Sequence, residues 1–167
     1  CSSDLALLQA VTDHADGFVR FRALTLLTGY SDPRTEDMME LAIASPNDRL
    51  REVGYAYFEM NPKPSLAPKM LAALDKEEGE FVRPALVRAL AALPADPRIV
   101  AVLMRDAMRG LDYFRSTVIE AIGDYKIAAA MPRLVEIAKV EGPLQDDAAT
   151  AIGKIGDRNQ LGVLAQM

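Results

Sequence analysis

Apolar residues recur along the chain with spacings of three and four positions, which is the period of an α-helix. In residues 81–93 one helical face collects six of them: Val82, Ala85, Leu86, Ala89, Leu90 and Leu93. Apolar and polar residues nowhere alternate strictly over six positions, which is the pattern of a half-buried β-strand. The sequence therefore predicts an all-α protein.

Prolines, glycines and short polar residues interrupt this pattern at regular intervals and predict the turns. Between them lie segments of about 10 to 14 residues, a common helix length. In Asp32-Pro33 and Asp96-Pro97 an aspartate that can cap a helix precedes proline at the first helical position, where a missing amide proton costs nothing. We expect paired helices to turn over near Asp16, Asn47, Glu80, Asp112 and Pro143.

A short pattern recurs along the whole chain. An apolar residue precedes arginine, or glutamine in the last copy, in Val19-Arg20, Leu50-Arg51, Val82-Arg83, Phe114-Arg115 and Leu144-Gln145. The steps between the polar residues of these pairs are 31, 32, 32 and 30 positions. Small, apolar or aromatic residues lie three, six and seven places later in every copy. A two-helix unit cannot bury its apolar face alone, so we expect the copies to stack.

The pattern Val-Arg-x-x-Ala-x-x-x-Leu, closed by Ala-Ile-Gly at 121–123 and 151–153, resembles HEAT repeats. It is most similar to the short HEAT-like type first associated with phycobilin lyases. The resemblance implies a right-handed α-α superhelix, a HEAT-like α-solenoid, of about five helix pairs plus a half repeat. We expect one HEAT-like domain over 1–167, with repeats at about 3–30, 31–62, 63–95, 96–127 and 128–157 and a partial repeat at 158–167.

The resemblance also implies that the second helix of each pair lies on the concave side, where a partner protein would bind. All ten aromatic residues fall on or beside these second helices. These aromatic residues either pack into the core or form a partner groove, for which Tyr55 and Phe21 are the best candidates. Phe18, Phe81 and Tyr113 share the position two before the arginine, and we expect them to pack structurally at the entries of their helices. We expect a partner to contact residues that point away from the apolar seam: Phe21, Thr25, Glu52, Tyr55, Glu59, Arg88 and Glu120. Tyr55 is expected to contribute most.

The recurring arginines allow two interpretations. In the structural one, which we favour, each arginine pairs with an acid or a carbonyl group in the turn before it, and these pairs fix the register of the stack. The acids available for this role are Asp16, Asp48, Glu80 and Asp112, and the arginines are Arg20, Arg51, Arg83 and Arg115. In the functional interpretation they form a cationic strip for an acidic ligand, although a net charge of −5 leaves little positive field.

Composition excludes several other functions. The acidic balance argues against nucleic acid as a partner, because phosphate binding needs clustered cations. His14 is the only histidine, so we expect no metal site. The sequence offers no nucleophile–base constellation, phosphate-binding loop or dinucleotide motif, so we expect no enzyme activity and no cofactor. No apolar run approaches the ~20 residues of a membrane span.

Cys1 is the only cysteine of the chain, which starts Cys1-Ser2-Ser3. This start resembles a mature bacterial lipoprotein, in which the signal peptide is removed immediately before a lipid-carrying cysteine. The resemblance implies lipidation of Cys1, a lipid-anchored location in the bacterial cell envelope, and no other membrane contact. The alternative is a cytoplasmic fragment of a longer chain, in which Cys1 marks a cut point.

Three functions remain to be weighed. We favour a non-catalytic protein–protein interaction scaffold or adaptor that uses the concave face of the solenoid, as a lipid-anchored subunit of a bacterial envelope complex if Cys1 is lipidated. The alternative, a phycobilin-lyase-like enzyme or ligand-binding HEAT protein, follows from the repeat subtype alone. A HEAT-like DNA glycosylase is the third, and the negative charge and the absence of tryptophan count against it.

Overall fold

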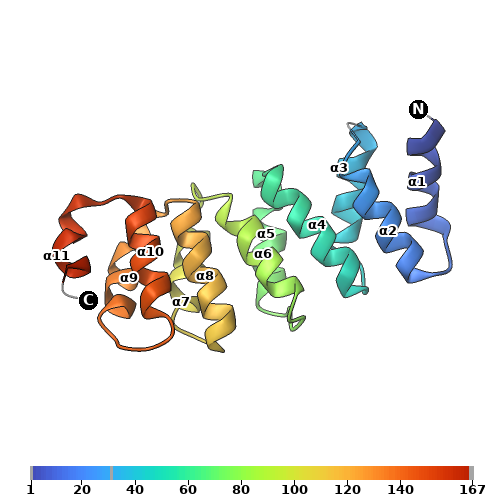
Figure 1. The fold of residues 1–167 in the computed structure, drawn as a ribbon. Helices are drawn as coiled ribbons and strands as arrows, with labels where there is room; N and C mark the ends of the chain where they lie inside the picture. The colour runs from blue at the N-terminus through green and yellow to red at the C-terminus, as the bar shows by residue number, and fades with distance from the viewer. Residues whose placement is uncertain (1, 31, 166–167) are drawn as a thin grey trace. The chain divides into compact units, whose positions relative to one another are not determined.

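A computed structural model of the chain describes residues 2–30 and 32–165. These residues form helices joined by short turns, with no strand among them, which confirms the all-α prediction (Figure 1). In chain order the α-helices are α1 (Ser2–Asp13), α2 (Gly17–Leu27), α3 (Pro33–Ala42), α4 (Asp48–Met60), α5 (Ala67–Leu74), α6 (Val82–Ala91), α7 (Pro97–Asp106), α8 (Asp112–Asp124), α9 (Met131–Ala138), α10 (Gln145–Ile155) and α11 (Leu161–Leu164). Three 3-10 turns, η1 (Pro64–Leu66), η2 (Ala128–Ala130) and η3 (Arg158–Gln160), precede α5, α9 and α11.

Local capping signals explain where the helices begin. The carboxylate of Asp16 accepts a hydrogen bond from the Phe18 amide at 2.8 Å, and the side chain of Asn47 accepts one from the Arg49 amide at 3.0 Å. Asp32 and Asp96 cap α3 and α7 in the same way, each with proline at the first helical position. The second helices α2, α4, α6, α8 and α10 begin within two residues of the predicted turnover points, although α8 and α10 have no side-chain cap.

The chain divides into two compact units. Unit 1 comprises Cys1–Pro62 and Glu77–Ala89, and unit 2 comprises Lys63–Lys76 and Leu90–Met167. In unit 1, α1 packs against α2, α3 packs against α4, and α4 also contacts α2. In unit 2, α8 packs against α10 and α7, and α9 packs against α10. Helices that follow one another along the chain therefore pair, as the repeat pattern predicts.

Each unit has its own apolar interior. The largest fully buried side chains of unit 1 are Tyr55, Phe58, Leu24, Leu27, Met39 and Leu86, and those of unit 2 are Met70, Leu74, Leu90, Ile99, Leu103 and Ile119. Most of these positions belong to the apolar periodicity of the sequence. Burial of such side chains is the main favourable term in folding, at roughly 25 cal/mol per Å² of apolar surface.

Two glycines mark places where helices approach closely. A Cβ atom on Gly54 would lie 2.7 Å from Cγ2 of Ile43, which shows how tightly α4 is seated against the end of α3. A Cβ atom on Gly123 of α8 would lie 2.7 Å from Cα of Ala151 in α10. Gly153 occupies the same repeat position as Gly123, yet nothing lies within 4 Å of its Cβ position among the described residues.

Cys1 lies outside the described residues, so its lipidation stays a prediction. Within the described part of the chain, no helix combines the length and the apolar character needed to cross a membrane.

Candidate binding grooves

Tyr55 is not on the surface, contrary to the expectation that it points away from the apolar seam. Its exposed fraction is 1%, and its hydroxyl lies 3.5 Å from the Ile43 carbonyl oxygen, to which it donates. Burial raises the pKa of the Tyr55 hydroxyl to about 12. The physical reason is that α4 contacts both α2 and α3, so that two faces of this helix are covered rather than one. Tyr55 therefore cannot serve as the main partner contact.

Glu59 and Arg88, expected as separate contacts for a partner, are paired with each other. The Arg88 Nε lies 2.7 Å from the Glu59 Oε1, with 31% and 16% of the two side chains exposed. Because Glu59 is on α4 and Arg88 on α6, the pair joins two helices of unit 1. Glu59 and Arg88 thus form an ion pair between two helices, whereas the sequence predicted separate contacts with a partner protein.

The remaining predicted contacts do not gather at one place. Phe21 and Thr25 lie one turn apart on α2, half-buried, with the Thr25 hydroxyl donating to the Phe21 carbonyl oxygen at 2.9 Å. Glu52 is half-buried on α4, also in unit 1, whereas Glu120 is exposed on α8 in unit 2. Binding of a partner by this set stays a prediction.

The recurring polar position has a common structural task. Arg51 donates to the Ser45 carbonyl oxygen at 2.9 Å, Arg115 to the Ala107 carbonyl oxygen at 3.1 Å, and Gln145 to the Ala138 carbonyl oxygen at 3.0 Å. These carbonyl groups lie at or just beyond the ends of α3, α7 and α9, where helical acceptors lack partners within their own helix. At these three positions the side chain of the second helix thus caps the first helix of its pair, and glutamine does so as well as arginine.

The two arginines of this set also bind carboxylates, and one of these carboxylates differs from the predicted partner. Arg115 pairs with Asp112 at 3.0 Å, in the turn before it. Arg51 pairs instead with Glu77, which follows it by 26 positions: its Nε and Nη2 donate to the two carboxylate oxygens at 2.8 and 2.9 Å. Asp48, the predicted partner, accepts from the Arg49 amide. Arg20 and Arg83 are half-buried on α2 and α6.

The Glu77 carboxylate is 7% exposed and also accepts the Gly79 amide at 3.0 Å. The hydrogen bonds from Arg51 lower the pKa of Glu77, and the same contact raises the pKa of Arg51. Charge-assisted bidentate pairs of this kind are among the stronger hydrogen bonds in proteins. Sequence reasoning missed Glu77 because no local spacing connects it to Arg51.

Replacing Glu77 with glutamine should lower the free energy of unfolding by about 1–2 kcal/mol at neutral pH, through loss of the paired charge. Because the folded-state pKa of Glu77 is depressed, its contribution is present above the unfolded pKa of about 4.3 and is lost as pH falls through the folded value. The difference between Glu77→Gln and the wild type should therefore shrink in acid. Urea unfolding across this pH range measures it, and the exposed neighbour Glu78→Gln is the control. A pH-independent difference would contradict the assignment.

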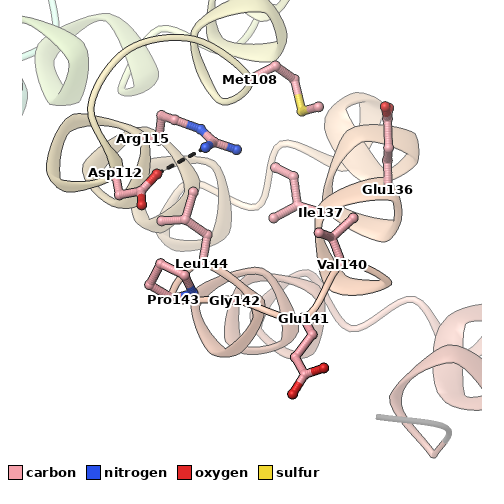
Figure 2. Close-up of a pocket in the computed structure, with 10 residues that line it drawn as sticks. All are labelled: Met108, Asp112, Arg115, Glu136, Ile137, Val140, Glu141, Gly142, Pro143 and Leu144. Atoms are coloured by element: carbon pink, nitrogen blue, oxygen red, sulfur yellow. Dashed lines mark hydrogen bonds and ion pairs between the residues drawn. The ribbon is translucent and has the colours of Figure 1, made fainter.

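A groove of about 300 Å³ lies in unit 2 between the ends of α7 and α9 and the beginnings of α8 and α10 (Figure 2). Figure 2 shows Met108, Ile137 and Leu144 pointing into the same space as the Arg115 guanidinium, whereas the Glu141 carboxylate points away. The other lining residues are Asp112, Glu136, Val140, Gly142 and Pro143. The groove is thus apolar with one cation at its wall, and that cation is already bound to Asp112.

Unit 1 contains an equivalent groove, also of about 300 Å³. Arg20 takes the place of Arg115, and Leu50, which directly precedes Arg51, takes the place of Leu144, which directly precedes Gln145. The remaining lining residues come from the ends of α1 and α3 and from α2: Val11, Thr12, Leu24, Met38, Leu41, Ala42 and Ser45. The same inter-repeat arrangement therefore recurs in both units.

A third groove, of about 460 Å³, lies in unit 2 on α7 and α9 and is lined by Ala101, Met104, Arg105, Met108, Arg109 and Arg133. Two of its arginines are paired with acids of the same unit. Arg105 binds Asp106 at 2.6 Å and Asp75 at 3.2 Å, and Arg133 binds Glu136 at 2.6 Å. This internal pairing offsets most of the positive charge of the groove.

The aromatic side chains two places before the arginine are exposed, which excludes the core interpretation for them. The exposed fractions are 57% for Phe18, 69% for Phe81 and 54% for Tyr113. Each lies at the start of a second helix or one residue before it, where the chain emerges from the turn. The ring of Phe18 lies 6.3 Å, centroid to centroid, from the ring of Phe21 on the same helix.

Known protein families and curated proteins offer no match to the chain. Among the described residues, no cluster of three or more histidine, cysteine, aspartate and glutamate side chains is placed to hold a metal ion.

Proposed function

We propose that the protein is a non-catalytic protein–protein interaction scaffold or adaptor, built from HEAT-like repeats stacked as a right-handed α-solenoid. The paired helices, the recurring cap at the arginine position and the repeated inter-helix grooves support this arrangement. Stacked repeats of this kind present extended surfaces on which one partner can contact several copies of the same position.

The observation that carries the proposal is the exposure of Phe18, Phe81 and Tyr113. Single exposed apolar residues are common on protein surfaces and need no explanation. Here, however, three large aromatic rings occupy one repeat position, and more than half of each is exposed. Aromatic side chains are enriched among the residues that dominate binding energy at interfaces. We therefore place the partner contact at the beginnings of the second helices rather than on the set centred on Tyr55.

The test compares two triple variants in affinity capture from the source organism, read out by quantitative mass spectrometry. Phe18→Ser, Phe81→Ser and Tyr113→Ser together should abolish retention of a partner, because each replacement removes exposed contact area. The thermal midpoint should stay nearly unchanged, since substitutions at exposed sites usually change stability by about 0.5 kcal/mol or less.

The matched control removes exposed apolar side chains that do not occupy the repeated position: Leu5→Ser, Met60→Ser and Leu161→Ser, with exposed fractions of 58%, 79% and 61%. This variant should keep the partner. If both triple variants retain the same proteins as the wild type, or both lose them, the repeated aromatic position is not the contact.

A further inference from the structure

The Arg20 guanidinium forms no hydrogen bond or ion pair with any described residue, in contrast to the guanidinium groups of Arg51 and Arg115. Its Nε is buried and has no hydrogen-bond partner. It lies in the groove of unit 1, where Leu24, Ala42 and Leu50 are 0%, 5% and 6% exposed. A buried cationic donor without a partner costs free energy, because water no longer solvates it and nothing replaces the water.

Equivalent arginines of the same chain show what such a side chain binds. Arg51 holds the Glu77 carboxylate with two parallel hydrogen bonds as well as the Ser45 carbonyl oxygen. Arg115 holds the Asp112 carboxylate and the Ala107 carbonyl oxygen. In both cases the repeat position presents its guanidinium to one carboxylate, a geometry that suits the planar fork of arginine.

No described residue supplies that carboxylate to Arg20. Asp16, in the turn before it, uses its carboxylate to cap α2 at the Phe18 amide. The partner of Arg51, Glu77, comes from the next copy of the repeat, where it lies six places before Arg83. The residue at the same place for Arg20 is Ser45, which lies six places before Arg51 and lines the groove. Its hydroxyl is short and uncharged, and it accepts the Asn47 amide at 3.1 Å. The position that a glutamate fills for Arg51 is therefore left open for Arg20.

We propose that the Arg20 groove binds an acidic–apolar segment of a partner protein, with a glutamate or aspartate side chain on the guanidinium and a neighbouring leucine-sized side chain against Met38 and Leu41, which line the groove and keep accessible surface. Charge complementarity identifies the carboxylate, and the apolar walls identify its neighbour. A volume of about 300 Å³ is at the lower end of ligand-sized pockets and suits a few side chains. This inference rests on the proposed partner-binding function and specifies the chemistry of the segment.

The experiment titrates the protein with acetyl-Leu-Glu-Leu-amide and with acetyl-Leu-Gln-Leu-amide, which has the same shape but no charge. The Nε–H signal of Arg20 and the methyl signals of Met38 and Leu41 are followed by NMR. The glutamate peptide should shift these signals, and the glutamine peptide should bind about tenfold more weakly, as expected for loss of a hydrogen bond to a charged group.

Three variants provide the comparison. Arg20→Gln should weaken binding of the glutamate peptide by about tenfold, whereas Arg22→Gln, on the exposed side of the same helix, should leave it unchanged. Ser45→Glu places a carboxylate where Glu77 lies relative to Arg83, and should compete with the peptide. Circular dichroism confirms that each variant is folded, and the two-peptide comparison on the wild type does not depend on any variant.

Equal binding of the two peptides, or the absence of any shift at Arg20, would overturn the proposal. Acetate binding as tightly as the peptide would also overturn it, since the site would then recognise a carboxylate without the segment. These outcomes leave the aromatic triple variant untouched, so failure here is distinguishable from failure of the proposed function.

Discussion

Replacing Tyr55 with alanine should lower the free energy of unfolding by about 3–5 kcal/mol, the range for truncating a buried aromatic side chain. The ring is 1% exposed and belongs to the interior of unit 1, beside the close approach of α4 to α3 at Gly54. Truncation removes apolar contacts and leaves a cavity that the surrounding helices can only partly fill. Urea unfolding at neutral pH measures the change.

Two controls separate burial of the ring from the other properties of Tyr55. Tyr55→Phe removes only the hydroxyl, whose 3.5 Å contact with the Ile43 carbonyl oxygen is long, and should cost about 1 kcal/mol or less. Tyr113→Ala removes a tyrosine that is 54% exposed and should change stability by about 0.5 kcal/mol or less. If Tyr55→Ala is as well tolerated as Tyr113→Ala, the placement of α4 between α2 and α3 is wrong.

Replacing Gly123 with alanine should lower the free energy of unfolding by about 2–3 kcal/mol, although alanine is the better helix former. The added methyl group would lie 2.7 Å from Cα and 2.9 Å from Cβ of Ala151, closer than atoms can approach. Because one of these contacts is to the backbone of α10, a side-chain rotation cannot relieve it. The helices α8 and α10 would have to separate, which loosens the interior of unit 2.

Gly153→Ala is the matched control, since it makes the same substitution at the same repeat position. Nothing lies within 4 Å of its Cβ position among the described residues, and its φ is not in the left-handed region. Alanine should therefore stabilise α10 by about 0.5–1 kcal/mol relative to glycine. Chemical denaturation of the two variants should show changes of opposite sign, and changes of the same sign would show that α10 does not pack on Gly123.

Gly123 and Gly153 also show that the packing of a residue cannot be predicted from its local sequence. Ala121-Ile122-Gly123 and Ala151-Ile152-Gly153 are identical as sequences and occupy the same repeat position. Their difference lies in what packs against them: α10 covers Gly123, and no described residue approaches Gly153. No local pattern carries that information, because it depends on which neighbour follows in space.

The sequence by itself determined the helices. Apolar periodicity, the capping residues Asp16 and Asn47, and the prolines at 33 and 97 act over a few residues, so the beginnings of the second helices could be predicted within two residues. The chain also determined the repeat position of the arginines, which the structure uses for capping the preceding helix at Arg51 and Arg115.

Only the tertiary structure decided which faces are covered and which charges meet. Tyr55 became interior because α4 has neighbours on two sides, whereas Phe81, in the turn before α6, is 69% exposed. Glu77 reaches Arg51 across 26 positions, whereas the buried Nε of Arg20 has no hydrogen-bond partner among the described residues. Burial and ion pairing depend on contacts between residues far apart in the chain, and a periodic sequence specifies each helix without specifying those contacts.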